Sequence, residues 1–415
     1  MRIAHVAVEI VPSGPGAYVG GLVKNLATIA EAQAVAGHDV DIITTDIRGR
    51  GATNGRGRGF RVRPVKTMGE YGSFVFAGSF VTGAARELTR AHRMDPYDVV
   101  HVHSAYASLA GIRYALSGVD APSAFSLYSP NFGLLPGHSC NGSFLRNGDR
   151  VAAAMLHGFD RTAVPSHSLR ARLLDMGLDG DRVSIVPPAL DPGLFGALPE
   201  KEAAREALGL PPDVPVLLYL GNFSTWKGVQ DLLRAIEMVR KAHPEAILLT
   251  AWGEPYEWSG NVRGEILDLM DRLGVAPAVR QVGILDDVRL ALRAADILVS
   301  PFHCTCKVLD YPLSILEAMA CERAVISTSV GGIPEVLGDG DRGVLVPPRD
   351  PTRLAGAITE LLDDPVRARI VAARGAEWAL ARFRPDLVNE ALQSLYRELR
   401  EGPRPGDAHP IAIAR

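Results

Sequence analysis

The chain has 415 residues, of which 47% are hydrophobic and 22% are charged, and its formal net charge is −3. One hydrophobic core rarely serves so many residues, so we expect two domains of roughly 200 residues each. This charge gives no basis for binding nucleic acid. No segment approaches the roughly 20 apolar residues of a membrane span, and the first residues lack the apolar core of a signal peptide. We therefore expect a cytoplasmic protein without stable membrane association.

Short apolar strands alternate with amphipathic helices along almost the whole chain, which is typical of parallel sheets in an α/β protein. In the first half we predict strands at Ile3–Ile10, Val40–Thr45, Val99–His103, Ala124–Tyr128, Thr162–Pro165 and Val183–Val186. In the second half we predict strands at Val216–Leu220, Ile247–Ala251, Arg280–Val282, Ile297–Ser300, Val325–Thr328 and Val344–Val346. The pattern indicates two Rossmann-like, doubly wound domains that face each other across a hinged cleft, with ligands beyond the carboxyl ends of the strands.

Prolines mark the expected boundary between the domains. The stretch from Pro187 to Pro192 cannot continue a helix or a central strand. We place the N-terminal domain at 1–190 and the C-terminal domain at 191–385. The last predicted helix, within 386–402, is too short to be a domain and must dock on one, and 403–415 is predicted to be a flexible tail.

Gly20 and Gly21 follow the first predicted strand and open a helix. Glycines at this position let the backbone approach a ligand and leave N–H groups free. The pattern is neither G-x-G-x-x-G nor G-x-x-x-x-G-K-[ST], which disfavours a nicotinamide dinucleotide and P-loop ATP hydrolysis. The Arg-rich stretch Arg48–Arg63 that follows is predicted to be a mobile loop.

Histidine and cysteine pairs are the candidates for hydrogen-bonding or metal chemistry. His101 and His103 close a strand and lie on one face of it. We expect His103, at the strand end, to reach a sugar hydroxyl, and His101 to be a core histidine. Neither this pair nor Cys304 and Cys306 has further ligands at a metal-binding spacing, so no metal is expected and the cysteines are interpreted as buried or loop thiols.

In the second half, Gly221 and Asn222 follow a strand, and Lys227 precedes a helix. A glycine, a short polar loop and a lysine at a helix start suit a diphosphate. The alternative is a solvent-exposed lysine in a turn. The stretch Gly283, Ile284 and Leu285 ends another strand at the same edge, where a nucleobase can rest against the backbone.

The segment Asp310–Cys321 combines a loop with a helix start. Ser314 and Glu317 have the S-x-x-E spacing of a capping box, which predicts a helix that starts at Ser314 with Glu317 in its first turn. The free N–H groups of a helix start suit a phosphate, and an acid one turn in can reach a ribose hydroxyl. The alternative is that Glu317 only caps its own helix.

Taken in order, these motifs resemble the retaining GT-B-fold glycosyltransferases of family 4, which include sucrose-phosphate synthase-like, mannosyltransferase and mycothiol-pathway members. The resemblance rests on Gly20-Gly21, Asp98–His103, Gly221 with Lys227-Gly228, Ala294–Pro301, Leu316–Cys321 and Gly331–Glu335. It spans nearly the whole chain. It implies a nucleotide-sugar donor, UDP- or GDP-linked, held mainly by the C-terminal domain, an acceptor held by the N-terminal domain, and a last helix that crosses back to the N-terminal domain.

The resemblance implies roles for individual residues: Lys227 at the donor diphosphate, Glu317 at the ribose hydroxyls, the backbone of Leu313 and Ser314 at the phosphates, Gly20 and Gly21 on the phosphate and acceptor side, and His103 near the donor sugar. Two departures concern the donor site. Asn222 stands where the family usually has arginine, which removes a positive charge. Leu309 stands where the family has the first of two glutamates, and the adjacent Asp310 is the candidate to replace it.

We therefore predict a metal-independent, retaining hexosyl transfer that needs no cofactor. Tyr128, Asn131 and His138 would border the acceptor. The absence of a long basic amphipathic helix favours a small soluble acceptor over a lipid-linked one, and a lipid- or polysaccharide-directed transferase is kept as an alternative. The composition resembles that of high-GC actinobacterial proteins, and by association it suggests natural-product, antibiotic or thiol biosynthesis. The alternatives are a nucleotide-sugar epimerase of the same architecture and a non-catalytic sugar-binding protein, and the sequence leaves a homodimer open.

Overall fold

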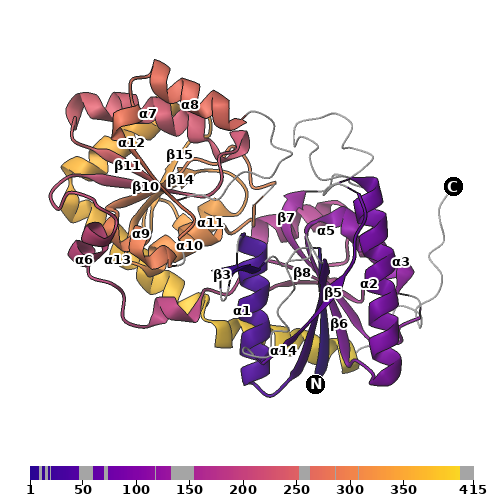
Figure 1. The fold of residues 1–415 in the computed structure, drawn as a ribbon. Coiled ribbons are helices and arrows are strands. Elements are labelled where there is room, and N and C mark those ends of the chain that lie inside the picture. The colour runs from indigo at the N-terminus through magenta and orange to yellow at the C-terminus, as the bar shows by residue number, and fades with distance from the viewer. Residues whose placement is uncertain are drawn as a thin grey trace. The chain divides into compact units, whose positions relative to one another are not determined.

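The computed structural model describes residues 1–8, 12–14, 17–18, 20–45, 59–69, 73–116, 118–131, 154–251, 262–285, 287–306 and 308–401 (Figure 1). The chain divides into two compact units, Met1–Ala189 with Pro385–Arg415, and Leu190–Arg384. Both boundaries fall one residue before the positions expected from the sequence. The two crossing segments leave the second unit side by side, because the Leu190 N–H donates to the Phe383 carbonyl at 2.9 Å.

The first unit contains a seven-stranded parallel sheet in the order β5-β4-β1-β6-β7-β8-β9. Its strands are β1 (Arg2–Ala7), β4 (Asp39–Thr45), β5 (Arg61–Val65), β6 (Val99–Tyr106), β7 (Ser123–Asn131), β8 (Arg161–Val164) and β9 (Val183–Ile185), and β2 (Pro12–Gly14) pairs with β3 (Ala17–Tyr18). The helical segments are α1 (Gly21–Val35), α2 (Phe74–Met94), η1 (Ala107–Gly111), α3 (Ile112–Ala115), α5 (His167–Asp175), η2 (Gly180–Arg182) and α14 (Pro385–Glu401).

Helices cover both faces of this sheet. Neighbouring residues of β1 alternate between two cores, Ile3 packing with α1 and α14, and Ala4 packing with α2, α3 and α5. Figure 1 shows α14, at the yellow end of the chain, beside α1. Its apolar face is long for a terminal helix, and Val388, Leu392, Leu395, Tyr396 and Leu399 are all buried in the first unit.

The second unit contains a six-stranded parallel sheet in the order β12-β11-β10-β13-β14-β15. Its strands are β10 (Val216–Leu220), β11 (Ile247–Ala251), β12 (Val279–Gly283), β13 (Ile297–Ser300), β14 (Ala324–Thr328) and β15 (Val344–Val346). The helical segments are η3 (Pro192–Phe195), α6 (Lys201–Ala207), η4 (Thr225–Lys227), α7 (Val229–Ala242), α8 (Val262–Arg272), η6 (Ala276–Ala278), α9 (Val288–Ala294), α10 (Leu313–Ala320), α11 (Ile333–Leu337), α12 (Pro351–Asp363) and α13 (Pro365–Arg382). The predicted doubly wound α/β architecture is confirmed in each unit.

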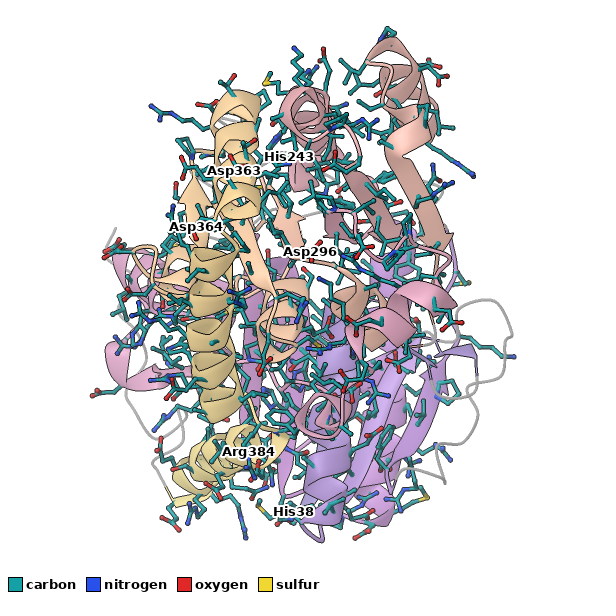
Figure 2. The ribbon with its side chains drawn as sticks, turned by 90° about the vertical axis from the view of Figure 1, so that its left-hand side faces the viewer. His38, His243, Asp296, Asp363, Asp364 and Arg384 are labelled. Atoms are coloured by element: carbon teal, nitrogen blue, oxygen red, sulfur yellow. A yellow bond between two sulfur atoms is a disulfide. The ribbon has the colours of Figure 1, made fainter. Side chains whose placement is uncertain are left out.

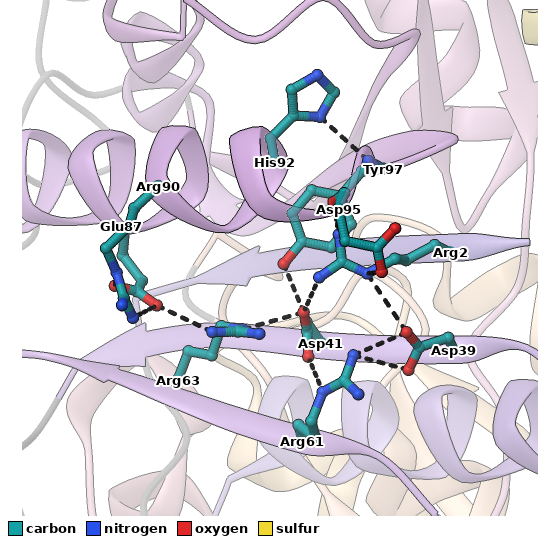
Figure 3. A network of polar contacts seen from close by, with 10 residues as sticks. All are labelled: Arg2, Asp39, Asp41, Arg61, Arg63, Glu87, Arg90, His92, Asp95 and Tyr97. Atoms are coloured by element: carbon teal, nitrogen blue, oxygen red, sulfur yellow. Dashed lines mark hydrogen bonds and ion pairs between the residues drawn. The ribbon is translucent and has the colours of Figure 1, made fainter.

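One edge strand was not predicted. β5 begins within the last residues of the stretch Arg48–Arg63 that was expected to be a mobile loop, and its arginines surround a buried carboxylate at the amino ends of the strands (Figure 3). Asp41 accepts from Arg61 Nε at 2.7 Å and pairs with Arg63 Nε at 2.9 Å and Arg2 at 3.2 Å. Burial acts to raise the pKa of Asp41, but hydrogen bonds from Arg61 and Tyr97 outweigh it and leave the pKa below its ordinary value. These arginines thus stabilise the sheet at the edge opposite the expected ligand.

No helix in the described part of the chain is both long and apolar enough to cross a bilayer.

Candidate active site

The order of strands reverses between β10 and β13 in the second unit. In wound sheets of this kind, ligands bind beyond the carboxyl ends of the strands at such a switch point. The loop after β10 carries Gly221 and Lys227, and the loop after β13 runs from Pro301 to Pro312 and leads into α10. The two loops expected to hold a diphosphate therefore flank the switch point.

The side chain of Lys227 folds back over Gly221. A Cβ atom on Gly221 would lie 2.6 Å from Lys227 Nζ, and Gly221 has a φ of +134°, so this position requires glycine twice over. Burial lowers the pKa of Lys227 from its ordinary value to about 8, and burial is the only cause of this shift. No charged side chain among the described residues contributes to it. An ammonium held in this way is prepared for an anionic guest.

The loop after β13 clamps the turn that carries Lys227. The His303 N–H donates to the Trp226 carbonyl at 2.7 Å, and His303 Nε2 lies 2.7 Å from Asp231 Oδ2 in the first turn of α7. Gly228, with a φ of +70°, packs so closely on the Pro301 carbonyl oxygen that a Cβ atom would lie 1.9 Å from it. The two loops at the switch point thus form one packed unit.

Asp310 is buried and faces the Gly331 loop. Thr305 Oγ1 donates to Asp310 Oδ1 at 2.6 Å, and a Cβ atom on Gly331 would lie 2.3 Å from the same carboxylate oxygen. The next residue, Tyr311, donates to Glu335 Oε2 at 2.7 Å. These contacts tie the loops after β13 and β14 together, a function that the sequence did not predict for this acid.

The predicted capping box is wrong. α10 begins at Leu313 after Pro312, no side chain caps it, and Ser314 is its second residue. Glu317 therefore lies in the second turn, 7% exposed, and not in the first turn where a capping box would place it. Together with burial, the negative charge of Glu317 raises the pKa of Cys321, one turn further on, to about 12. Pro312 starts the helix in place of the capping box, since its ring fixes φ and it has no backbone N–H that needs a partner.

Most other predicted donor residues also lie at strand ends. Gly283 ends β12, and Ile284 and Leu285 follow it, with the Ile284 side chain 56% exposed. Asn222 is half-buried, and its carbonyl accepts from Tyr219 OH at 2.9 Å. In the first unit, Gly20 is the N-cap of α1 with a φ of +103°, and Gly21 is its first helical residue. These glycines open a helix after β1, as predicted.

The histidine predicted to reach the donor sugar lies inside the core of the first unit. β6 runs on to Tyr106, so His103 is not at the strand end, and it is 1% exposed. Its Nδ1 lies 2.9 Å from Tyr128 OH and its Nε2 lies 2.8 Å from His5 Nδ1, while His5 Nε2 lies 2.7 Å from Gln33 Oε1. With Tyr128 as the first donor, every nitrogen in this row is satisfied in the neutral form. His103 has no free ring nitrogen here for a sugar hydroxyl.

His101 completes the cluster. Its Nδ1 lies 2.7 Å from Tyr396 OH of α14 and its Nε2 lies 2.8 Å from Ser126 Oγ, and Gln33 Nε2 lies 3.5 Å from the same tyrosine. Ligand atoms of the three histidines lie within 4.8 Å of one another, yet each nitrogen is engaged in a hydrogen bond rather than free for a metal. Burial lowers the pKa of His5 to about 4 and the pKa of His101 and His103 well below the ordinary value.

The predicted acceptor-side residues are distributed differently. Tyr128 is buried in the histidine cluster rather than exposed to a ligand. Asn131 is the last residue of β7, at the carboxyl edge of the sheet. His138 lies outside the described residues.

The cysteine prediction needs a correction. Cys304 and Cys306 form a disulfide within the loop after β13, whereas the sequence was interpreted as showing free thiols. Cys321 is a free, buried cysteine. The spacing of the two cysteines argued only against a metal site. It carries no information on whether two thiols two residues apart form a disulfide.

His303 and Asp231 are site residues that sequence reasoning missed. Their side chains meet although 72 residues separate them in the sequence. His303 lies in the loop after β13, and Asp231 lies in the first turn of α7, close to Lys227 along the chain. An acid in the first turn of a helix that follows a lysine motif was the available signal, but it is more often explained by the helix dipole.

Comparisons with known proteins identify the family. Residues 20–189 match the family model described as glycosyl transferase 4-like domain, and residues 214–364 match glycosyl transferases group 1. The D-inositol 3-phosphate glycosyltransferase of Acidothermus cellulolyticus is 30% identical over 417 residues, covering 96% of this chain and 90% of the relative. The enzyme of the same name from Thermomonospora curvata is 31% identical over 396 residues, covering 90% of each chain.

Solved structures share the fold. Sucrose-phosphate synthase from Thermosynechococcus elongatus superposes with a TM-score of 0.81 at 24% identity, over 96% of this chain and 98% of that chain. HepE of Anabaena in complex with UDP-glucose gives a TM-score of 0.77 at 18% identity, over 96% and 100%. Both family models, the full-length relatives and the two wound sheets lead to one conclusion: the chain belongs to the family 4 glycosyltransferases of the GT-B fold.

Proposed function

We propose that the protein transfers a hexosyl group from a UDP- or GDP-sugar to a small soluble acceptor, with retention of configuration at the anomeric carbon and without a metal. The observation that carries the proposal is the ammonium of Lys227, held over Gly221 at the switch point, with a pKa lowered by burial alone. Such a group gains most from an anion that arrives with the substrate. A nucleoside diphosphate supplies that anion.

In the proposed reaction, the bond between the anomeric carbon and the β-phosphate oxygen breaks, the acceptor oxygen or sulfur bonds to the anomeric carbon, and the acceptor's proton passes to the departing diphosphate. Negative charge develops on the departing diphosphate. Lys227 and the free N–H groups around Leu313 and Ser314 at the start of α10 stabilise that charge, and each such donor typically contributes ~3 kcal/mol. Glu317 binds the ribose hydroxyls. Because Asn222 adds no charge, the site depends more on Lys227 than it would with an arginine there.

Relatives support the substrate class. The two bacterial relatives are named for D-inositol 3-phosphate, and one structural neighbour is named for sucrose phosphate, both small polar molecules. HepE was solved with UDP-glucose. We infer a cytoplasmic enzyme that modifies a small metabolite, in natural-product, antibiotic or thiol biosynthesis.

A nucleotide-sugar panel tests the proposal. The protein is incubated with UDP-, GDP- and TDP-sugars, with and without small polyol, sugar-phosphate and thiol acceptors, and nucleotide release is measured. We expect acceptor-dependent release with one base, and a product whose anomeric proton coupling in NMR matches that of the donor. An inverted product would overturn retention, an epimerised donor would indicate an epimerase, and release only with lipid or polysaccharide acceptors would replace the acceptor class.

Metal independence has its own measurement. Because a lysine and helix N–H groups stabilise the leaving diphosphate, we expect the rate in excess EDTA to equal the rate in Mg²⁺. A loss of activity in EDTA that Mg²⁺ or Mn²⁺ restores would contradict this part of the proposal.

A further inference from the structure

The turn that carries Lys227 is held by a residue from the neighbouring loop. His303 contacts this turn twice, through its backbone N–H to the Trp226 carbonyl at 2.7 Å and through its ring to Asp231 at 2.7 Å. Trp226 precedes Lys227 directly, and Asp231 lies in the first turn of the helix that follows. The two contacts therefore bracket Lys227 on both sides along the chain.

The histidine–aspartate pair is sheltered from solvent. The side chains of His303 and Asp231 are 15% and 13% exposed. Arg234 also pairs with Asp231, with a distance of 3.4 Å between its guanidinium and the carboxylate, and its side chain is 46% exposed. A sheltered pair loses less of its attraction to water and salt than a surface pair does. His303 is therefore the persistent partner of Asp231, whereas water and salt can displace Arg234.

We propose that His303 and Asp231 are positioning residues for the donor diphosphate, because together they fix the turn Thr225–Lys227 so that Lys227 Nζ stays at Gly221. The proposal rests on the proposed function, since it assumes that a diphosphate binds at Lys227. Neither residue needs to touch the substrate. Their effect is on where the ammonium lies before the donor arrives, which is the kind of preorganisation that a small displacement destroys.

Two consequences separate this role from a merely structural one. If the turn loosens, the ammonium moves away from its place over Gly221, so donor binding weakens while the residue that acts on the leaving group is still present. The loosened ammonium also becomes more hydrated. Its pKa then rises from about 8 toward the ordinary lysine value of 10.5.

The test compares His303→Ala, His303→Gln and Asp231→Ala with a matched control. His243→Ala breaks another histidine–aspartate pair, at 3.1 Å, between the C-cap of the same α7 and Asp363 at the end of α12, both labelled in Figure 2. UDP and GDP are the probes, and their affinities are measured by calorimetry between about pH 7.5 and 10.5, where the diphosphate is ionised throughout. Thermal unfolding establishes that each variant is folded.

We expect His303→Ala and Asp231→Ala to weaken nucleotide binding and raise the donor KM by about 10-fold, with kcat changed by less than about threefold. The pH at which affinity begins to fall moves upward from about 8 in both variants. His303→Gln, whose amide can donate to Asp231, recovers most of the affinity, and His243→Ala binds as the wild type does.

Unchanged affinity and an unchanged pH profile in folded His303→Ala and Asp231→Ala would overturn the positioning role and leave the proposed function standing. Equal losses in His303→Ala and His243→Ala would also overturn it, because any broken pair on α7 would then suffice. A wild-type protein that binds neither UDP nor GDP would overturn the proposed function itself, and the positioning role with it.

Discussion

Lys227 carries a charge that no described side chain neutralises, and its pKa is lowered by burial alone. At neutral pH the side chain of Lys227 is mostly protonated, and a bound diphosphate favours the protonated form further. If the donor diphosphate binds at Lys227 as proposed, we expect it to bind best below about pH 8. Gly221 is part of the same arrangement, because any side chain at position 221 would displace the ammonium of Lys227.

Lys227→Ala removes this charge without disturbing the core. We expect donor turnover to fall roughly 100-fold or more while the melting temperature stays within a few degrees of the wild type, because the ammonium acts on the leaving diphosphate. Steady-state kinetics with the preferred nucleotide sugar measure the loss. Near wild-type kinetics would contradict the assigned role of the lysine.

Asp310 lies beside the proposed donor site, but the contacts described for its carboxylate are structural. Asp310→Ala leaves the Thr305 hydroxyl without its acceptor and opens a space beside Gly331. We expect the free energy of unfolding to fall by about 1–3 kcal/mol, as for other buried hydrogen-bonding groups. Denaturant unfolding measures it, with the exposed Asp213→Asn as control. If instead kcat fell 100-fold at unchanged stability, Asp310 would be the replacement for the missing glutamate.

Among the elements, β1, β6, β7, α1 and α14 share the histidine cluster, and burial keeps its rings neutral. A protonated His5, His101 or His103 would place a positive charge in the core, where the fully buried rings have no solvent to stabilise it. The folded state therefore keeps these rings neutral well below the pH at which the unfolded chain protonates them.

The sign of the pH dependence follows from this difference. Because burial lowers the pKa of His5 from 6.5 to about 4, its contribution to stability is complete above pH 6.5 and is lost as the pH falls from 6.5 to 4. The shift corresponds to roughly 3 kcal/mol for His5, and His101 and His103 act in the same direction. Urea unfolding at pH 7.5 and at pH 5 measures the effect. Equal stability at the two pH values would show that the cluster does not stay neutral.

At the scale of the whole molecule, the chain leaves the first unit at Ala189 and returns to it at Pro385. The returning helix α14 completes the core of the first unit with Val388, Leu392, Leu395, Tyr396 and Leu399. Tyr396 also reaches the histidine cluster. The N-terminal unit is therefore built from both ends of the chain, and it cannot finish folding before the last helix has been made.

Truncation after Arg384 tests this dependence. Burying five large apolar side chains stabilises a fold by on the order of 10 kcal/mol, which is comparable to the whole stability of a domain. We expect the truncated protein to lose the calorimetric transition of the first unit and to aggregate. A chain ending at Gly402, which lacks only the predicted tail, serves as control and should unfold as the full-length protein does. A truncated protein with both transitions intact would contradict the packing argument.

The amino-acid sequence by itself determined the repeated strand–helix pattern, every strand predicted in both sheets, and the glycine–lysine motif at the carboxyl end of β10. These are local properties, because periodicity, turn residues and helix starts are set by neighbours within a few residues. The helix start at Leu313 came within one residue of the prediction, although through Pro312 rather than a capping box.

Only the tertiary structure decided the partners of the polar side chains. The bond between His5 and His103 joins residues 98 apart, the one between His101 and Tyr396 joins residues 295 apart, and Asp231 meets His303 across 72 residues. Which groups meet depends on strand order and register. His103, whose place on its strand suggested a ligand, instead bonds side chains of the two neighbouring strands, and His101 bonds a helix from the far end of the chain.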